Sequence, residues 1–322
     1  MTNKETLPHI LRGSQPVPDI SVVIVNWNLL EFLHGCLESV RRFGSGVAVE
    51  VIVVDNNSDD GSVEMVERDF PEVVVIRNSE NVGFSRASNQ GMKAASGRYL
   101  FLLNNDCLVQ DSALHRMVAY MDSHPEAGVC GPRVVNSDGT LQVYSKGYYP
   151  SILRIMGKMF IPERIKYSWV TSSGLYEYDD KKKIREYDWL SGCALMVRRR
   201  ALEDVGLLDA DVFMYCEDVD WCYRMRKSGW KVMYLPQAQV LHYGGQSMLR
   251  QRGAIVGSHA AGLVAYYSRY HGHAAALLFR IVLAAGYAVQ APGWVIGGLF
   301  GRRSGLDKLK RKYTRRWSDS GK

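Results

Sequence analysis

The chain has 322 residues, of which 47% are hydrophobic and 23% are charged. This composition is typical of a folded protein with one large or two modest domains, and it excludes a disordered chain. The net charge is +7, and residues 302–322, with nine Lys or Arg and two acids, account for all of it. A basic tail on a neutral body predicts a local anionic partner, such as an anionic membrane surface, and no nucleic acid.

The N-terminal residues and the cysteines indicate a cytosolic protein. Residues 1–18 contain three prolines and little pattern, so we expect a flexible arm. The first nineteen residues contain no apolar run that could serve as a secretory signal. The six cysteines form no C-x-x-C pair and show no zinc-type spacing, which predicts reduced thiols.

From residue 20 onward, apolar β-branched runs alternate with amphipathic segments. The runs predict strands that are buried on both faces, and the spacing of Leu33 and Leu37 predicts a helix. Alternation at this spacing predicts βαβ units and a parallel sheet. In chain order we expect strands at 20–28, 49–55, 72–78 and 98–106, and helices at 31–43, 62–70, 85–96 and 112–124.

The pattern is less regular after residue 140. Residues 140–187 are aromatic and basic, and we expect an excursion from the sheet there. Strands are expected again at 189–199 and 231–236. Between them, a helix begins at a cluster of acids and ends at Gly229.

Four polar clusters lie at the ends of the predicted strands. In open parallel sheets the ligand binds beyond the carboxyl ends of the strands, so these clusters share one rim and predict a binding site there. No G-x-G-x-x-G or P-loop motif is present, so neither a dinucleotide nor a P-loop phosphate site is indicated. The clusters are Asn26–Asn28, Asp55–Ser58, Asn78–Asn81 and Asn104–Asp106.

Asn104 and Asp106 form an N-x-D pair at the last of these ends. Alternate residues of an extended chain share a face, so both side chains can point the same way. A hard cation such as Mg²⁺ takes one or two carboxylates and completes its shell with substrate phosphates. The alternative is a strand end that simply enters a turn, because Asn and Asp favour turns.

Four other positions each allow two interpretations. Glu217 and Asp218 can cap a helix and complement its dipole, or, crowded with Asp220, one of them can have a raised pKa and act as a general base. His242 is either a metal ligand or an ordinary packed histidine. Asp55 either accepts from a nucleotide base or ribose, or forms an Asx turn.

The order and spacing of six blocks resemble the inverting family 2 glycosyltransferases of the GT-A fold, closest to the bacterial rhamnosyltransferase-like branch. The resemblance covers about residues 19–250 and implies an α/β fold with a mostly parallel central sheet and helices on both faces. The blocks are SVVIVNWN, VIVVDNNSDDGS, RNSENVGFSRASNQGMKAASGRYLFLLNND, WLSGCALMVRR, GLLDADVFMYCEDVDWCYRMRKSGW and VLHYGGQS.

The resemblance implies a donor site and a metal site. Asp55 matches the aspartate that reads the pyrimidine base. Asn104 and Asp106 match the D-x-D motif that binds Mg²⁺ or Mn²⁺, with Asn in place of the first Asp, and His242 matches a third metal ligand of some relatives. The nucleotide-contacting segments match Asn26, Asn28, Asn81, Gly83, Arg86, Asn89, Asn104 and Asn105.

The resemblance also implies the chemistry. Asp218 of the pair Glu217–Asp218 matches the catalytic base, and Trp189 and Gly192 match the acceptor side. The base takes a proton from an acceptor hydroxyl, which attacks the anomeric carbon and inverts its configuration. dTDP-rhamnose is the expected donor and a polyprenyl-diphosphate-linked glycan the expected acceptor, while UDP-hexoses, UDP-galactofuranose and UDP-N-acetylglucosamine remain open as donors. The non-catalytic alternative is a membrane-docked subunit that only binds a nucleotide-sugar.

Residues 281–300 are uncharged over about the length that spans a bilayer. A span with the basic tail in the cytosol would place residues 19–250 outside, away from nucleotide-sugars. We therefore expect this segment to lie in the interface or re-enter near Pro292–Gly293, with a buried helix as the alternative. The catalytic domain is then 19–250, and 251–322 is a helical membrane-associating region. This predicts a peripheral or monotopic enzyme on the cytoplasmic face of the bacterial inner membrane.

Overall fold

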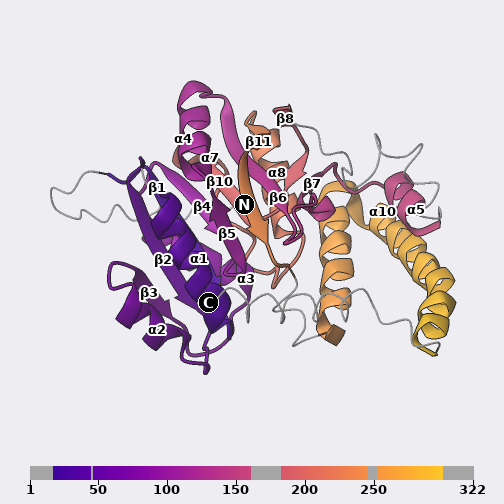
Figure 1. The fold of residues 1–322 in the computed structure, drawn as a ribbon. Helices are drawn as coiled ribbons and strands as arrows, with labels where there is room; N and C mark the ends of the chain where they lie inside the picture. Colours follow the sequence, from indigo (N-terminus) through magenta and orange to yellow (C-terminus); the bar gives the residue numbers. More distant parts are fainter. Residues whose placement is uncertain (1–16, 45, 161–182, 245–251, 300–322) are drawn as a thin grey trace.

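The computed structural model describes residues 17–44, 46–160, 183–244 and 252–299. Nearly all of the predicted arm, residues 161–182 of the predicted excursion, and the basic tail lie outside the described residues. The main sheet has nine strands in the order β3-β2-β1-β4-β10-β6-β11-β5, with β8 also paired to β11 (Figure 1). The strands are β1 Ile20–Asn26, β2 Val49–Asp55, β3 Val74–Arg77, β4 Tyr99–Leu103, β5 Cys107–Gln110, β6 Ala127–Val135, β8 Arg185–Glu186, β10 Ala194–Arg198 and β11 Lys231–His242.

The sheet is parallel in one half and mixed in the other. Strands β3, β2, β1 and β4 are parallel, as the alternating pattern predicted. Strand β10 is antiparallel to both β4 and β6, β6 is parallel to β11, and β5 and β8 are antiparallel to β11. The fold is therefore the expected GT-A-like α/β architecture, with a mixed central sheet.

Helices cover both faces because each strand alternates its side chains between two cores. In β1, Val22 and Ile24 pack into one core and Val23 into the other. The first core also contains side chains of α1 Leu30–Phe43, α2 Ser62–Asp69 and α4 Ala113–Ser123. The second contains side chains of α3 Phe84–Ala94, α5 Ile152–Phe160, α7 Arg199–Val205, α8 Glu217–Lys227 and α10 Arg252–Leu299.

The carboxyl ends of the parallel strands lie at one rim, as predicted. Asn26 at the end of β1 is in register with Asp55 at the end of β2. Strand β4 runs parallel to β1 on the other side and ends at Leu103, directly before Asn104. A second, two-stranded sheet pairs β7 Lys146–Gly147 with β9 Trp189–Leu190 and leads into β10.

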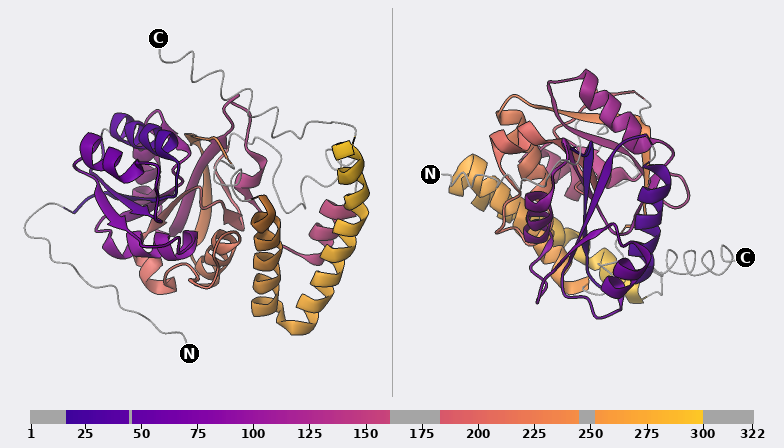
Figure 2. Two further views of the ribbon diagram at one scale, coloured as in Figure 1. Left: turned by 90° about the horizontal axis from the view of Figure 1, so that it is seen from below. Right: turned by 90° about the vertical axis from the view of Figure 1, so that its left-hand side faces the viewer.

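The C-terminal helix α10 is broken at Gly272, not near Pro292–Gly293 as we expected from the sequence. Gly272 has φ +83°, a conformation that glycine adopts readily, and helical structure continues to Leu299. Figure 2 shows two arms that fold back on each other like a V beside the sheet domain. Residues His259–Val289 are long and apolar enough for a membrane span, with mean hydropathy 1.6, but the turn at Gly272 divides them between the arms.

Two helical glycines test the packing of α1 and α3. A Cβ at Gly91 would lie 2.4 Å from Val23 Cγ1 on β1, whereas a Cβ at Gly35 would meet nothing closer than 3.5 Å. We expect Gly91→Ala to lower the free energy of unfolding by about 1–3 kcal/mol through overpacking. Gly35→Ala should raise it by up to about 1 kcal/mol, because alanine favours helix. Denaturant titration measures both, and equal effects would contradict the packing described.

Candidate active site

A buried hydrogen-bond network joins the ends of the parallel strands. The fully buried Asn26 donates from Nδ2 to Asp55 Oδ1 at 3.0 Å and to Ser58 Oγ at 3.1 Å. Asn105, after β4, donates from Nδ2 to Asn26 Oδ1 at 2.8 Å. Asp55 Oδ2 also accepts from Ser58 N, three residues further on, at 2.8 Å, so Asp55 does bond to the turn that follows it. Three strand ends are thus held together by side chains.

Two loops border this network. Asn28 has φ +52°. Its backbone N donates to Ser58 Oγ at 2.9 Å, and its side-chain Oδ1 accepts from Asp59 N at 2.8 Å. In the loop before α3, Asn81 Oδ1 accepts from Gly83 N at 3.0 Å. Each loop is shaped by a local side-chain bond, which leaves its backbone at the rim.

Arg86 and Asn89 bind a distant segment of the chain. Arg86 Nε donates to Ala210 O at 2.9 Å. The Asn89 amide both donates to Leu208 O at 2.9 Å and accepts from Leu208 N at 3.0 Å. These two side chains therefore tie α3 to residues 208–210.

Asp106, His242 and Asn104 converge at the end of β4. His242 Nε2 lies 3.1 Å from Asp106 Oδ1 and 3.4 Å from Asn104 Nδ2. The other ring nitrogen, Nδ1, lies 2.6 Å from Gln142 Oε1, which can only accept, so Nδ1 carries a proton and Nε2 faces Asp106. A carboxylate, an imidazole oriented by a second hydrogen bond, and an amide are a suitable donor set for Mn²⁺ or Mg²⁺.

Two cysteines lie beside His242, which the sequence spacing did not indicate. Donor atoms of Cys107, Cys193 and His242 lie within 4.8 Å of one another. Burial raises the pKa of Cys107, and its thiol donates to Cys193 O at 3.4 Å. Burial opposes protonation of His242, but the charges of Asp106 and Cys193 outweigh it and raise its pKa. A cation bound to Asp106 would take the place of the proton on His242 Nε2. A protonated Cys107 thiol, by contrast, is a poor metal ligand.

Glu217 and Asp218 begin α8. Asp218 Oδ2 accepts from Gly192 N at 3.0 Å and Oδ1 accepts from Val219 N at 2.8 Å. Burial raises the pKa of Asp218 to about 6, although these two N–H groups lower it. Burial and then the Asp218 charge raise the pKa of Glu217 to about 8, and its Oε2 has no hydrogen-bond partner within the described ranges. At neutral pH, Asp218 is therefore ionised and Glu217 is protonated.

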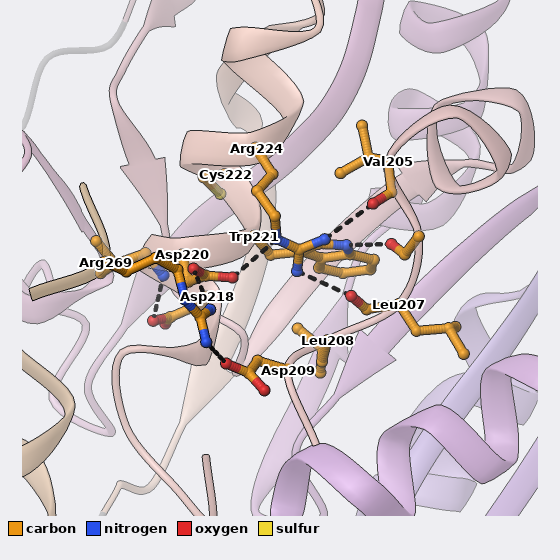
Figure 3. Close-up of polar contacts among 12 residues, drawn as sticks. Val205, Leu207, Leu208, Asp209, Asp218, Asp220, Trp221, Cys222, Arg224 and Arg269 are labelled. Atoms are coloured by element: carbon orange, nitrogen blue, oxygen red, sulfur yellow. Dashed lines mark hydrogen bonds and ion pairs between the residues drawn. The ribbon is translucent and has the colours of Figure 1, made fainter. Parts of the chain in front are cut away.

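Asp220, the third acid of this cluster, belongs to a different network. It accepts from Arg224 Nε at 2.8 Å and from Arg269 Nη1 at 3.1 Å (Figure 3). It also accepts from Tyr270 OH at 2.6 Å. Arg269 also binds Asp209. The crowding that raises the pKa of Glu217 therefore comes from Asp218, and Asp220 is a structural residue.

The three groups meet at one rim. Asn104 N donates to Cys193 O at 2.9 Å, and the preceding Gly192 binds Asp218, so the metal-type cluster and the acid pair share one loop. Asn105, between Asn104 and Asp106, bonds to the network around Asp55. Trp189 lies on β9, the strand that leads into this loop. Its side chain is buried and donates from Nε1 to Tyr148 O at 3.0 Å.

The turn before α8 is strained. Tyr215 and Cys216 both adopt left-handed conformations, with φ +73° and +71°. Such residues cost on the order of 1–3 kcal/mol each and persist only where the surroundings hold them. Burial, followed by the charges of Glu217 and Asp106, raises the pKa of Tyr215 to about 12.

The raised pKa of Glu217 predicts a pH-dependent stability. The carboxyl stabilises the fold while it is protonated, and this contribution is lost as pH rises through about 8. Glu217→Gln should therefore match the wild type in melting temperature at pH 5 and exceed it by several degrees at pH 9. The exposed Glu203→Gln is the control and should change neither value. An equal effect of Glu217→Gln at both pH values would contradict a buried neutral carboxyl.

Sequence comparison identifies relatives of the whole catalytic region. The model of the family "Glycosyl transferase family 2" matches residues 21–206. An N-acetylglucosaminyl-diphospho-decaprenol L-rhamnosyltransferase of Mycobacterium tuberculosis is 28% identical over 274 residues, which cover 81% of this chain and 88% of the relative. A low-salt glycan biosynthesis hexosyltransferase of Haloferax volcanii is 22% identical over 70% of this chain and 67% of the relative.

Solved structures share the fold. A mannosyltransferase from Pyrobaculum calidifontis, in complex with GDP-Man and Mn²⁺, aligns with TM-score 0.52 and 16% identity over 91% of this chain and 84% of that one. GalNAc-T7 with UDP, GalNAc and Mn²⁺ aligns with TM-score 0.51 and 19% identity over 70% of this chain and 44% of that one. Because the family model covers more than half of the chain, and these structures share its fold, the chain belongs to glycosyl transferase family 2.

Proposed function

We propose that this protein transfers a sugar from a nucleotide-diphospho-sugar to a hydroxyl of a lipid-linked glycan, with inversion at the anomeric carbon. The observation that carries the proposal is the convergence of Asp55, Asp106 and Asp218 on one rim of a family 2 fold. One carboxylate then serves the nucleotide, one serves a cation and one serves the acceptor.

The nucleotide binds at the ends of β1 and β2. Asp55 faces the base. Its carboxylate already accepts hydrogen bonds from Asn26 and Ser58, so a remaining lone pair would accept from the base. Arg86 and Asn89 contribute by holding residues 208–210 against α3, rather than by reaching the nucleotide with free side chains. The other donor-side residues are Asn26, Asn28, Asn81, Gly83, Asn104 and Asn105.

A divalent cation, Mg²⁺ or Mn²⁺, would be held by Asp106, His242 and Asn104. When bound, it would neutralise charge on the leaving diphosphate. Asp106 supplies the one carboxylate, and Gln142 fixes the His242 ring so that Nε2 faces the site. The neutral Asn104 lowers the negative charge of the site relative to two aspartates, so substrate phosphates must supply part of the attraction.

Asp218 is the general base of the proposed reaction. With a pKa of about 6 it is ionised at neutral pH, yet basic enough to accept the proton of the attacking hydroxyl. The N–H groups of Gly192 and Val219 hold its carboxylate in place. As the new C–O bond forms, the bond to the diphosphate breaks on the opposite face, which inverts the sugar. Trp189 and Gly192 lie on the acceptor side.

The substrates follow from the 28% identical relative, whose name gives rhamnose as the sugar and a GlcNAc-diphospho-polyprenol as the acceptor. We assign dTDP-rhamnose as donor and an acceptor of that class, and we place the enzyme on the cytoplasmic face of the bacterial inner membrane. Residues 19–250 form the catalytic domain and 251–322 the membrane-associating region. UDP-linked hexoses are the donors to test next.

The alternative is a subunit that binds a nucleotide-sugar without transferring it, and Asn104 at the first D-x-D position is the observation that favours it. Metal-dependent hydrolysis of the donor separates the two, because a pure binding subunit would show none.

The base assignment predicts the effect of Asp218→Asn. The variant should fold and bind donor normally but lose about 10²–10⁴-fold in kcat, because the amide cannot take a proton. Asp211→Asn, an exposed aspartate of the neighbouring loop, is the control and should retain activity. Steady-state kinetics with a lipid-linked acceptor measure both, and near-normal kcat in Asp218→Asn would refute the assignment.

The metal assignment predicts the effect of changes at Gln142. Gln142→Ala should weaken Mn²⁺ binding about 10–100-fold, because it frees the ring that this side chain orients. Gln142→Glu keeps an oxygen acceptor for Nδ1 and should retain the affinity. Calorimetric titration of Mn²⁺ in the presence of UDP gives both values, and unchanged binding in Gln142→Ala would remove His242 from the ligand set.

A further inference from the structure

Exposed large apolar side chains are concentrated on one part of the molecule. Of the eleven in the described residues, seven lie on α5 and on the second arm of α10. These helices lie side by side in Figures 1 and 2, and they pack against each other. The seven are Leu153, Met156, Phe160, Leu277, Leu278, Ile281 and Val289. Monomeric soluble proteins rarely leave a contiguous apolar patch of this kind in water.

The helix α5 presents one apolar side outward. Leu153, Met156 and Phe160 are spaced by three and four residues, so they lie on the same side of the helix, and they are 80%, 43% and 42% exposed. Ile155 points the other way and is 1% exposed, in the same core as Phe279 of α10. The inner side of α5 therefore packs into the core, whereas its outer side is exposed in the part of the chain that the structure describes.

The second arm of α10 has a similar outer side. Leu277, Leu278, Ile281 and Val289 are 50–62% exposed, and the alanines at 274, 285 and 288 between them are exposed too. A groove of about 520 Å³ between the two arms is lined mostly by small apolar side chains. The second arm therefore presents apolar side chains both outward and towards the groove.

We propose that α5 and the second arm of α10 form one surface that inserts into the leaflet of an anionic lipid bilayer that faces the protein. Charge favours a bilayer over a second copy of the chain, because residues 221–306 contain no Asp or Glu and the following tail is strongly basic. The turn at Gly272 separates the second arm of α10 from the first, so the second arm can lie in one leaflet without crossing the bilayer. The inference deepens the proposed function, since a lipid-linked acceptor must be met at a membrane.

The surface is tied firmly to the catalytic helix. Arg269, near the turn of the hairpin, binds Asp209 and Asp220 (Figure 3). Tyr270 OH also bonds to Asp220. On the same arm, a Cβ at Gly262 would lie 2.6 Å from Tyr215 O, in the strained turn before α8. Insertion of the surface would therefore orient Asp218, two residues beyond that turn, relative to the bilayer.

Vesicle binding by the full chain tests the proposal. Vesicles of phosphatidylethanolamine and phosphatidylglycerol are sedimented with the wild type, with Leu153→Glu/Met156→Glu, and with Leu277→Glu/Ile281→Glu. Each double variant replaces two apolar side chains of the proposed inserting surface with charged ones, so the binding constant should fall by at least about tenfold. The control Val17→Glu/Ile184→Glu changes two exposed apolar residues elsewhere and should bind as the wild type does.

Wild-type binding by the α5 variant would overturn the proposal. So would a change in oligomeric state by light scattering without loss of vesicle binding, because a second copy would then cover the face. Far-UV circular dichroism and Mn²⁺-dependent donor hydrolysis in detergent should be unchanged in both variants, since neither change touches the rim. If neither the wild type nor the variants hydrolyse the donor, but the variants still lose vesicle binding, the proposed function is wrong and the proposed membrane surface is supported.

Discussion

The chemistry of this protein depends on how three nearly buried carboxylates are stabilised at one sheet rim. A buried charge is costly unless it is hydrogen-bonded or paired, and the fold meets this requirement in three ways. Asp55 is bonded to side chains and backbone of its own neighbourhood, Asp106 is paired with His242, and Asp218 accepts two backbone N–H groups. Burial raises the pKa of Asp218 towards neutrality, to about 6, which suits a group that is proposed to accept a proton.

Two acids in the first turn of α8 belong to different hydrogen-bond networks. Asp218 faces the rim, whereas Asp220, two residues later, is paired with Arg224 and Arg269. The first turn of the helix therefore divides its carboxylates between the site and the hairpin. The left-handed conformations of Tyr215 and Cys216 set the direction in which the chain enters this turn. The close packing of Gly262 against these two residues holds them in place. The proposed base and the first arm of α10 are thus joined in one connected arrangement.

The parallel half of the sheet and the rim could be predicted from the sequence. The strands before Asn26, Asp55 and Asn104 are apolar runs with local turn signals, and parallel strands bring their ends together. Strands β5 and β6 were missed: β5 has only four residues, and β6, although longer, pairs with strands that are distant in sequence. The metal-type cluster was predicted only in part: His242 was included by resemblance, but Gln142 and the two cysteines carry no local signal.

The sequence by itself determined the secondary-structure alternation, the polar strand ends, the acid-free stretch 221–306 and the basic tail after it, because hydrophobic period, turn chemistry and charge are local. The tertiary structure decided which of these residues meet. It joined Gln142 to His242, Gly192 to Asp218, and Arg269 to Asp220. It also placed the break of α10 at Gly272 and turned one side of α5 outward. Contacts of this kind depend on register and packing between distant elements, and no local pattern of residues encodes them.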